Sequence, residues 1–257
     1  MNDTLVKKHF EQQLNQALQQ MYDKVCSCED GLLSLVAIDR GICLLENLNY
    51  PQTLIEDLPP GSGDVAFPCA NPLPKIISLA PRTILDLGCG TALDALFCVS
   101  SLSELQRLTG LDASSRLLAK GEELLSHFPA KAEKITLLQA DLNQLSSYRL
   151  ETSELILMNG SFNLIYDKMK FFTELFPLLT TGGTLLIYDF ILTETLPPGF
   201  SNEVDNWLWN IGGALNSAEL KKIVTDAGLK IVEINEIERI DPVARCEIII
   251  SHEKRGN

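Results

Sequence analysis

The chain has 257 residues with 21 Lys and Arg against 34 Asp and Glu, a formal net charge of −13, and 46% of its residues are hydrophobic. This length suits one large α/β core, and the apolar content is typical of a folded globular domain. The acidic balance argues against nucleic acid as a partner, because such binding needs clustered Lys and Arg. The sequence shows neither a run of roughly 20 apolar residues nor a signal-peptide pattern, so we expect no membrane partner and a cytoplasmic location.

Seven cysteines at irregular spacing do not resemble a disulfide framework, so we expect reduced thiols. Cys26 and Cys28 form a C-x-C pair, but no second pair follows and the three histidines are scattered along the chain. The ligand spacing therefore predicts no metal site.

The first eighty residues predict an N-terminal helical cap. Phe10, Leu14, Leu18 and Met21 recur at steps of three or four, which predicts an amphipathic helix over residues 3–25. Two short helical patterns follow at 35–48 and 51–58, and the Pro- and Gly-rich residues 59–74 exclude a long regular element. We expect residues 1–80 to form a cap or lid that leads into the core.

Residues 81–257 predict the main domain. Apolar runs at 83–87, 107–111, 135–140, 154–159 and 183–190 alternate with helical patterns at 92–101, 114–127 and 168–179. Alternating elements of this kind form a mainly parallel sheet that is covered by helices on both faces. The fold class is therefore α/β, a Rossmann-like doubly wound sheet.

The last part of the chain predicts a lid insertion and an antiparallel pair of strands. An irregular segment at about 193–215 contains Trp207 and Trp209, which cannot both face the same side of a helix. A helix opened by Asn216 and Ser217 leads to apolar runs at 229–238 and 245–253. Only a short turn joins these two runs, so they must pair antiparallel.

The stretch ILDLGCGTALDALF, residues 84–97, predicts the ligand site. It places a bare glycine turn between a strand and a helix, where ligands contact doubly wound sheets. Asp112 ends the next strand at the same edge, where a carboxylate can bind the diol of a ribose. The ligand is therefore predicted to contain a nucleoside, either a nicotinamide or flavin dinucleotide or S-adenosylmethionine.

Spacing and charge favour S-adenosylmethionine over a dinucleotide. Counted from Gly88, Leu93 stands where the dinucleotide fingerprint has its third glycine. Asp86 would repel a pyrophosphate, whereas it suits a ligand that carries a sulfonium and an ammonium group. A nicotinamide-dependent oxidoreductase is the weaker alternative.

The motif D-L-G-C-G-T, Asp112, Q-A-D-L at 139–142 and G-G-T-L-L-I at 182–187 together resemble class I S-adenosylmethionine-dependent methyltransferases. The resemblance implies seven strands in the order 3-2-1-4-5-7-6, with strand 7 antiparallel, and methyl transfer to a small-molecule acceptor. Ala92 replaces the family's third glycine and should tighten the turn slightly. The implied cofactor-binding residues are Asp86, Gly88, Cys89, Gly90, Asp94, Asp112, Ala113, Asp141, Leu142 and Asn159.

The roles of these residues follow from the resemblance. Asp112 would hold the ribose hydroxyls, and Asp141 and Leu142 would flank the adenine. Cys89 is expected to be a small packing residue of the turn. Asp94 is either a solvated helix residue or an anchor near the methionine tail, and Asn159 either faces the transferable methyl or forms a turn.

A second, looser resemblance links residues 48–74, 157–168 and 207–229 to arsenite methyltransferases, which hold trivalent arsenic through cysteine thiolates. Cys69 falls at one of the expected thiol positions, and Cys26 and Cys28 lie near an N-terminal pair. Gly160 and Ser161 stand at the end of the fourth strand, and the WLWNIGG segment contains no cysteine, so two expected thiols are missing.

Besides the nicotinamide-dependent oxidoreductase, three functions remain open at this level. The first is methylation of a small uncharged or cationic molecule by an S-adenosylmethionine-dependent enzyme. The second is methylation of a trivalent arsenical held by Cys69 with Cys26 or Cys28, and the third is a non-catalytic cofactor-binding protein.

Direct displacement requires alignment rather than a dedicated base. Candidate catalytic residues, by position only, are Asn159, Tyr166, Asp189 and Glu203. Candidate substrate contacts are Cys69, Trp207 and Trp209.

Overall fold

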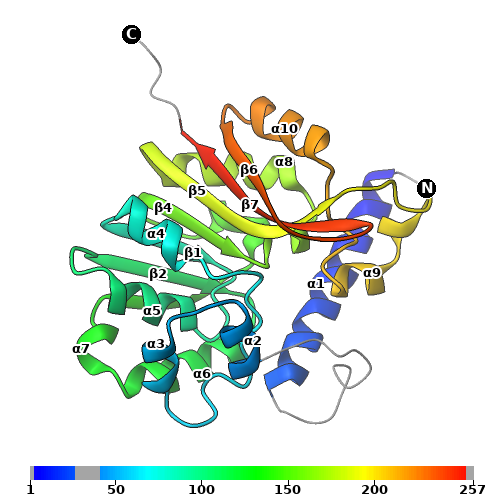
Figure 1. Ribbon diagram of the computed structural model, residues 1–257. Coiled ribbons are helices and arrows are strands. Elements are labelled where there is room, and N and C mark those ends of the chain that lie inside the picture. Colours follow the sequence, from blue (N-terminus) through cyan, green and yellow to red (C-terminus); the bar gives the residue numbers. More distant parts are fainter. Residues whose placement is uncertain (1–2, 27–40, 253–257) are drawn as a thin grey trace.

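The computed structural model describes residues 3–26 and 41–252, and within this range a seven-stranded sheet carries helices on both faces (Figure 1). The strand order is β3-β2-β1-β4-β5-β7-β6, which confirms the predicted topology. The strands are β1 (Thr83–Leu87), β2 (Arg107–Asp112), β3 (Ile135–Gln139), β4 (Ser153–Asn159), β5 (Leu179–Leu192), β6 (Lys230–Ile240) and β7 (Val243–Ser251).

Strand direction follows the expected division. The pairs β1–β2, β1–β4, β2–β3 and β4–β5 are parallel, whereas β7 pairs antiparallel with both β5 and β6. Residues 241 and 242 alone connect β6 to β7, which forces the antiparallel arrangement. The carboxyl ends of β1, β2 and β4 therefore open at one edge of the sheet.

Alternation along the strands assigns side chains to two hydrophobic clusters, one on each face of the sheet. In β4, Leu155 and Leu157 belong to one cluster, and Ile156 and Met158 belong to the other. The first cluster includes residues of α4 (Leu73–Leu79), α5 (Leu93–Ser101) and α6 (Ser115–Ser126), and the second includes residues of α8 (Lys168–Leu175) and α10 (Ser217–Asp226). Burial on both faces explains why the strands read as apolar throughout.

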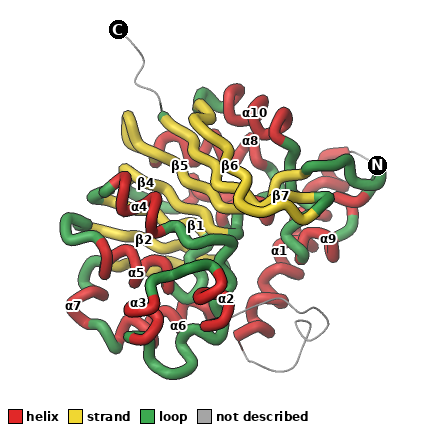
Figure 2. The backbone as a smooth tube through the Cα atoms, viewed as in Figure 1, coloured by secondary structure: helices red, strands yellow, loops and turns green. Residues whose placement is uncertain are grey.

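The N-terminal part contributes to the same core. α2 (Gly41–Asn47) and α3 (Gln52–Glu56) supply Leu45 and Ile55 to the cluster that also holds α5. α1 (Asp3–Cys26) instead lies beside the carboxyl ends of the strands, next to α9 (Val204–Leu208), as the tube view also shows (Figure 2). The first part of the predicted 35–48 helix lies outside the described residues.

The predicted helix over 168–179 is wrong at its end. α8 stops at Leu175, and Pro177 lies in the 3-10 turn η4 (Phe176–Leu178) that follows. Proline supplies no N–H to continue the hydrogen bonds of the α-helix, so the chain turns into β5 earlier than its apolar spacing indicates.

Short elements complete the chain: α7 (Pro129–Ala132), η2 (Leu142–Ser147), η3 (Phe162–Leu164) and η5 (Phe200–Asn202). Among the helices that the structure describes, none combines the length and apolar character needed to cross a bilayer.

Candidate functional site

A cleft of about 600 Å³ opens at the carboxyl ends of β1, β2 and β4, and residues of α1 form part of its wall. All ten predicted cofactor-binding residues line this cleft. They come from segments spread over residues 86–159, so the sheet topology brings together what the sequence motifs indicated separately.

The two glycines of the turn after β1 are required for different reasons. Gly88 has φ +85°, and a Cβ there would stand 2.5 Å from the Cβ of Ser161, so packing excludes a side chain. Gly90 has φ +55°, and no atom lies within 4 Å of the position that its Cβ would take. Gly90 therefore leaves main chain open to the cleft, where a ligand can contact it.

Asp112 joins the end of β2 to the glycine turn. Its Oδ2 accepts from the Gly90 N–H at 2.9 Å, and its Oδ1 accepts from the Ser114 N–H at 2.8 Å. Burial raises the pKa of Asp112, while these backbone donors lower it. Each carboxylate oxygen keeps a second lone pair, so a diol in the cleft can still donate to it.

Asp86 is the buried acid beneath the cleft. Its side chain is 3% exposed, and its Oδ2 has no hydrogen-bond partner. Burial, followed by the charges of Asp94 and Asp112, raises the pKa of Asp86 well above its usual value. An unpartnered buried carboxylate oxygen is costly, and a cation in the cleft would supply what it lacks.

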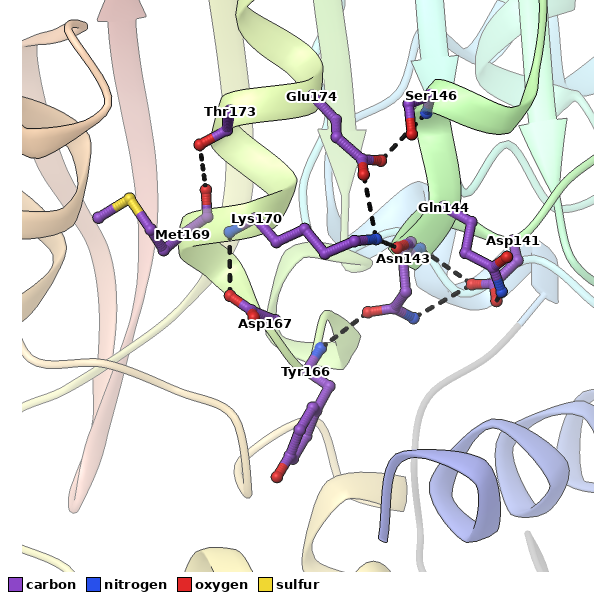
Figure 3. Close-up of polar contacts among 10 residues, drawn as sticks. All are labelled: Asp141, Asn143, Gln144, Ser146, Tyr166, Asp167, Met169, Lys170, Thr173 and Glu174. Carbon is purple, nitrogen blue, oxygen red and sulfur yellow. Dashed lines mark hydrogen bonds and ion pairs between the residues drawn. The ribbon is translucent and has the colours of Figure 1, made fainter. Parts of the chain in front are cut away.

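The rim formed by residues 141–147 is held by α8. The Asp141 carboxylate accepts from the N–H and side chain of Asn143 and from the Gln144 side chain. Lys170 donates to the Asn143 carbonyl and pairs with Glu174 at 3.1 Å, and Glu174 in turn accepts from the Ser146 N–H (Figure 3). These contacts fix the rim that is expected to flank the adenine.

Asn159 is fully occupied at the opposite end of the cleft. Its Oδ1 accepts from the N–H groups of Cys69 and Ala70 at 2.9 and 3.1 Å, and its Nδ2 donates to Asp94 Oδ2 at 2.8 Å and to the Ala70 carbonyl at 2.9 Å. Tyr50 donates to Asp94 Oδ1 at 2.7 Å. Asn159 thus fixes the 69–70 segment and the Asp94 carboxylate relative to one another.

Two predicted residues lie away from the cleft surface. Cys69 is 9% exposed, is absent from the lining, and packs behind Gly160. Burial raises the pKa of its thiol well above the usual value. Asp189 is fully buried and accepts from the N–H groups of Asn163 and Phe190 and from the Asn210 side chain, so it organises loops.

Tyr166 and Trp207 line a second, separate groove, and Trp209 lines neither. The rings of Phe10, Tyr166 and Trp207 pack together, with centroids 5.6 to 6.3 Å apart. Tyr166 gives only its N–H to the Asn143 network, and its ring points away from it (Figure 3). Trp207 is 5% exposed and Trp209 is 48% exposed, so the two side chains face different surroundings, as their spacing predicts.

Sequence reasoning placed the first helix in a cap or lid, but it identified neither the residues of α1 that line the cleft nor Tyr50. Asn15, Gln19 and Tyr22 of α1 line the cleft, and Asn15 approaches Asp141 at 3.5 Å. The only signal was the Gln-rich outer face of the first helix, which a solvated helix would share. Tyr50 precedes Pro51 in a segment without regular period, so only the fold could place its hydroxyl.

The electrostatics of the cleft are one-sided. Asp86, Asp94, Asp112 and Asp141 line it, and no Lys, Arg or His is among the described residues that line it. Within the described part of the chain, no group of His, Cys, Asp and Glu has the arrangement that could hold a metal ion. The cleft is therefore suited to a cation and unsuited to an anion.

These features fit S-adenosylmethionine. The Gly90 backbone and Asp112 match a ribose, the 141–147 rim lies where an adenine would extend, and the orphaned Asp86 oxygen matches a positively charged methionine portion. The donor set contains no residue that would favour a pyrophosphate.

Comparisons with known proteins agree with this geometry. A model of the methyltransferase domain family matches residues 80–228, more than half of the chain. The arsenite methyltransferase of Halobacterium salinarum is 24% identical over 91% of this chain and 61% of its own length. The human arsenite methyltransferase is 25% identical over 67% of this chain and 52% of its own length.

A solved structure shares the fold. The arsenic(III) S-adenosylmethionine methyltransferase of Chlamydomonas reinhardtii superposes with a TM-score of 0.65 at 23% identity, covering 79% of this chain and 73% of that one. The predicted resemblance to class I methyltransferases and to the arsenite branch is confirmed. The chain belongs to the methyltransferase domain family and has the fold of S-adenosylmethionine-dependent methyltransferases.

Proposed function

We propose that the protein is an S-adenosylmethionine-dependent methyltransferase that acts on a small uncharged or cationic molecule. The observation that carries the proposal is the cleft itself, where Gly90, Asp112 and the unpartnered Asp86 oxygen converge without any cationic side chain among the described lining residues. S-adenosylmethionine, when bound, supplies a methyl group on a positively charged sulfur that is already activated for displacement.

The protein's own residues bind, orient and exclude water. Asp112 and the Gly90 backbone hold the nucleoside end, Asp86 faces the positive charge, and α1, which packs against α9, would close the cleft. Alignment of this kind supplies about 7–11 kcal/mol of the barrier reduction in favourable cases. Asn159 contributes by fixing the 69–70 segment rather than by contact with the methyl group.

Methylation of trivalent arsenicals is the second candidate, because both curated relatives named above are arsenite methyltransferases. Among the described residues, Cys89 is the cysteine that lines the cleft, and it is buried in the glycine turn with its thiol pKa raised by burial. Cys69 lies behind the surface, nothing is described of the Cys26 side chain, and Cys28 lies outside the described residues. The geometry favours an organic acceptor, and loss of arsenical methylation in Cys69→Ser would reverse that preference.

Isothermal titration with S-adenosylmethionine and S-adenosylhomocysteine tests the proposal. Asp112→Ala should weaken both ligands roughly 100-fold, since hydrogen bonds to a charged group contribute about 1.5–3 kcal/mol. Asp57→Ala removes an exposed carboxylate that does not line the cleft, and this variant should bind as the parent does. No heat with the parent protein, or unchanged binding by Asp112→Ala, contradicts the assignment.

Turnover separates an enzyme from a non-catalytic cofactor-binding protein. Incubation with methyl-labelled S-adenosylmethionine and a mixture of small metabolites should transfer label to a metabolite. Binding without any transfer would support the non-catalytic reading.

A further inference from the structure

The Asp94 carboxylate and the Ala70 carbonyl both lie within hydrogen-bond distance of the Tyr50 hydroxyl, but these three groups have fewer protons than hydrogen-bond contacts. The Tyr50 hydroxyl lies 2.7 Å from Asp94 Oδ1 and 2.9 Å from the Ala70 carbonyl oxygen. It has one proton and faces two acceptors, so it can donate to only one of them at a time. When Asp94 is ionised, one of the two short contacts has no proton.

A proton on Asp94 completes this network. Asp94 can then donate to the Tyr50 oxygen, which frees the Tyr50 proton for the Ala70 carbonyl. Asn159 Nδ2 already supplies its two protons to Asp94 Oδ2 and to the same carbonyl, at 2.8 and 2.9 Å. The cluster therefore has one vacant place for a proton, in a cleft that Asp94, Tyr50 and Asn159 all line.

Building on the proposed function, we propose that the Asp94–Tyr50 pair accepts a proton from the methyl acceptor, which identifies the acceptor as an amine or a hydroxyl compound without anionic groups. The acceptor's lone pair forms the new bond to the methyl carbon, and the electron pair of the broken carbon–sulfur bond stays on sulfur. The acceptor's proton passes to Asp94, and later to water.

The chemistry of the acceptor follows from the need for this proton. A nitrogen or oxygen nucleophile loses a proton when it is methylated, whereas the lone pair of trivalent arsenic attacks without losing one. A base is useful to the first and has no role in the second. Because no Lys, Arg or His is among the described residues that line the cleft, an acceptor with a carboxylate, phosphate or sulfate group would find no cationic side chain there.

The surroundings of Asp94 support its use near neutral pH. Burial raises the pKa of Asp94 to about 6, against the hydrogen bonds from Asn159 and Tyr50, which lower it. The titratable groups that its charge influences are Tyr50 between α2 and α3, Asp86 on β1, Cys98 on α5 and Tyr188 on β5, and none of them is a cation. A general base works best with a pKa close to the working pH.

The test measures methyl transfer from labelled S-adenosylmethionine to four separate pools from pH 5 to 9. The pools are small primary amines, phenols and alcohols, carboxylates of matched size, and sodium arsenite. We expect label in the amine or the hydroxyl pool, with a rate that falls as pH drops through about 6. Asp94→Asn should reduce transfer at least 100-fold, while its affinity for S-adenosylhomocysteine stays within about threefold of the parent.

Tyr50→Phe distinguishes a role in proton transfer from a purely structural role, because only the first would change the pH profile of the rate. It keeps the ring against Phe97, 5.7 Å between centroids, and removes the hydroxyl. Because the Tyr50 hydrogen bond lowers the pKa of Asp94, its loss should shift the acidic limb of the rate profile to higher pH. A calorimetric titration checks the same shift in the pKa of Asp94. An acceptor from the labelled pool is titrated into the complex with S-adenosylhomocysteine in buffers of different ionisation enthalpy, and the dependence of the heat on the buffer gives the number of protons exchanged on binding.

The outcomes separate this inference from the proposed function. Failure to bind S-adenosylmethionine refutes the methyltransferase itself. Binding with label in the carboxylate or arsenite pool, no label in the amine and hydroxyl pools, full activity in Asp94→Asn, or a large loss of S-adenosylhomocysteine affinity in that variant overturns the inference alone. The last result would assign Asp94 to the cofactor's ammonium group instead.

Discussion

The two halves of the cleft are built in different ways. The proposed cofactor half, consisting of Asp86, the 88–90 turn, Asp112 and the 141–147 rim, comes from strand ends that follow one another along the chain. The proposed acceptor half, consisting of Tyr50, Asp94 and Asn159 with the 69–70 backbone behind them, joins segments up to 109 residues apart through side-chain hydrogen bonds. The first half is thus a property of local motifs and sheet topology, and the second depends on long-range packing.

The two halves also differ in how their charges are balanced. In the acceptor half, both Asp94 oxygens accept short hydrogen bonds from Tyr50 and Asn159. In the cofactor half, Asp86 keeps an orphaned oxygen in a buried place. The acceptor half is therefore organised before ligand binds, whereas the cofactor half holds a carboxyl oxygen without a hydrogen-bond partner, which a positively charged ligand would stabilise.

Asp86→Asn should have the largest effect on this difference between the two halves. It removes the unpartnered charge, so the ligand-free protein should gain about 1–3 kcal/mol of unfolding free energy at pH 8. The affinity for S-adenosylmethionine should fall tenfold or more, because the positive portion of the ligand loses its counter-charge. Urea unfolding and calorimetric titration measure the two effects.

The pH dependence of the gain in unfolding free energy shows whether the charge of Asp86 causes it. The folded protein holds a proton on Asp86 up to a higher pH than the unfolded chain does, since burial raises the pKa. The stability of the parent should therefore fall as pH rises above the usual carboxyl range, and the advantage of Asp86→Asn should grow. An advantage that is constant from pH 5 to 8 would mean that charge is not responsible.

The same division decides what could be predicted from the sequence. The mainly parallel sheet and the cofactor-binding candidates follow from apolar runs, glycine spacing and the position of acids after strands, and the strand order follows from the family resemblance. Tyr166 and Asp189 were chosen by position along the chain, and the structure places them outside the cleft. Position does not reveal direction: the Tyr166 ring turns toward Phe10, and the Asp189 carboxylate turns into loops.

Tyr50 shows the other limit. Its role depends on a hydroxyl that reaches an acid 44 residues further along the chain, on a different element. No periodicity carries that information, because Tyr50 lies between two short helical patterns and belongs to neither. Contacts of this kind emerge only when the cap packs on the same core as α5.

Glu174→Gln should have an intermediate effect, confined to the adenine end of the cofactor half. Although burial acts to raise it, the Ser146 N–H and Lys170 hold the pKa of Glu174 below its usual value, so the residue stays ionised at neutral pH. Neutralising it should loosen the 141–147 rim and weaken adenosine binding about three- to tenfold. Glu122→Gln on the exposed side of α6 is the matched control. Equal affinities of the two variants would show that α8 does not support the adenine end of the cleft.

Ala92→Gly should have the smallest effect, and it tests how backbone strain and side-chain packing balance in the glycine turn. Ala92 has φ +59°, a left-handed conformation that costs a side-chain-bearing residue about 1–2 kcal/mol, so the substitution for the family's glycine strains the turn more than its sequence indicates. The methyl group is fully buried and contributes about 0.8 kcal/mol in return. Glycine should therefore stabilise the protein by a few tenths to about 1 kcal/mol in urea unfolding.

Ala80→Gly separates the two contributions to that small number. Ala80 has φ +45° but is exposed at the end of α4, so glycine there relieves the backbone without removing a buried methyl group. Its gain should exceed that of Ala92→Gly by about the value of the methyl group. If Ala92→Gly destabilises the protein while Ala80→Gly stabilises it, packing outweighs backbone strain at the turn, and the alanine is part of how this cofactor half is held rigid.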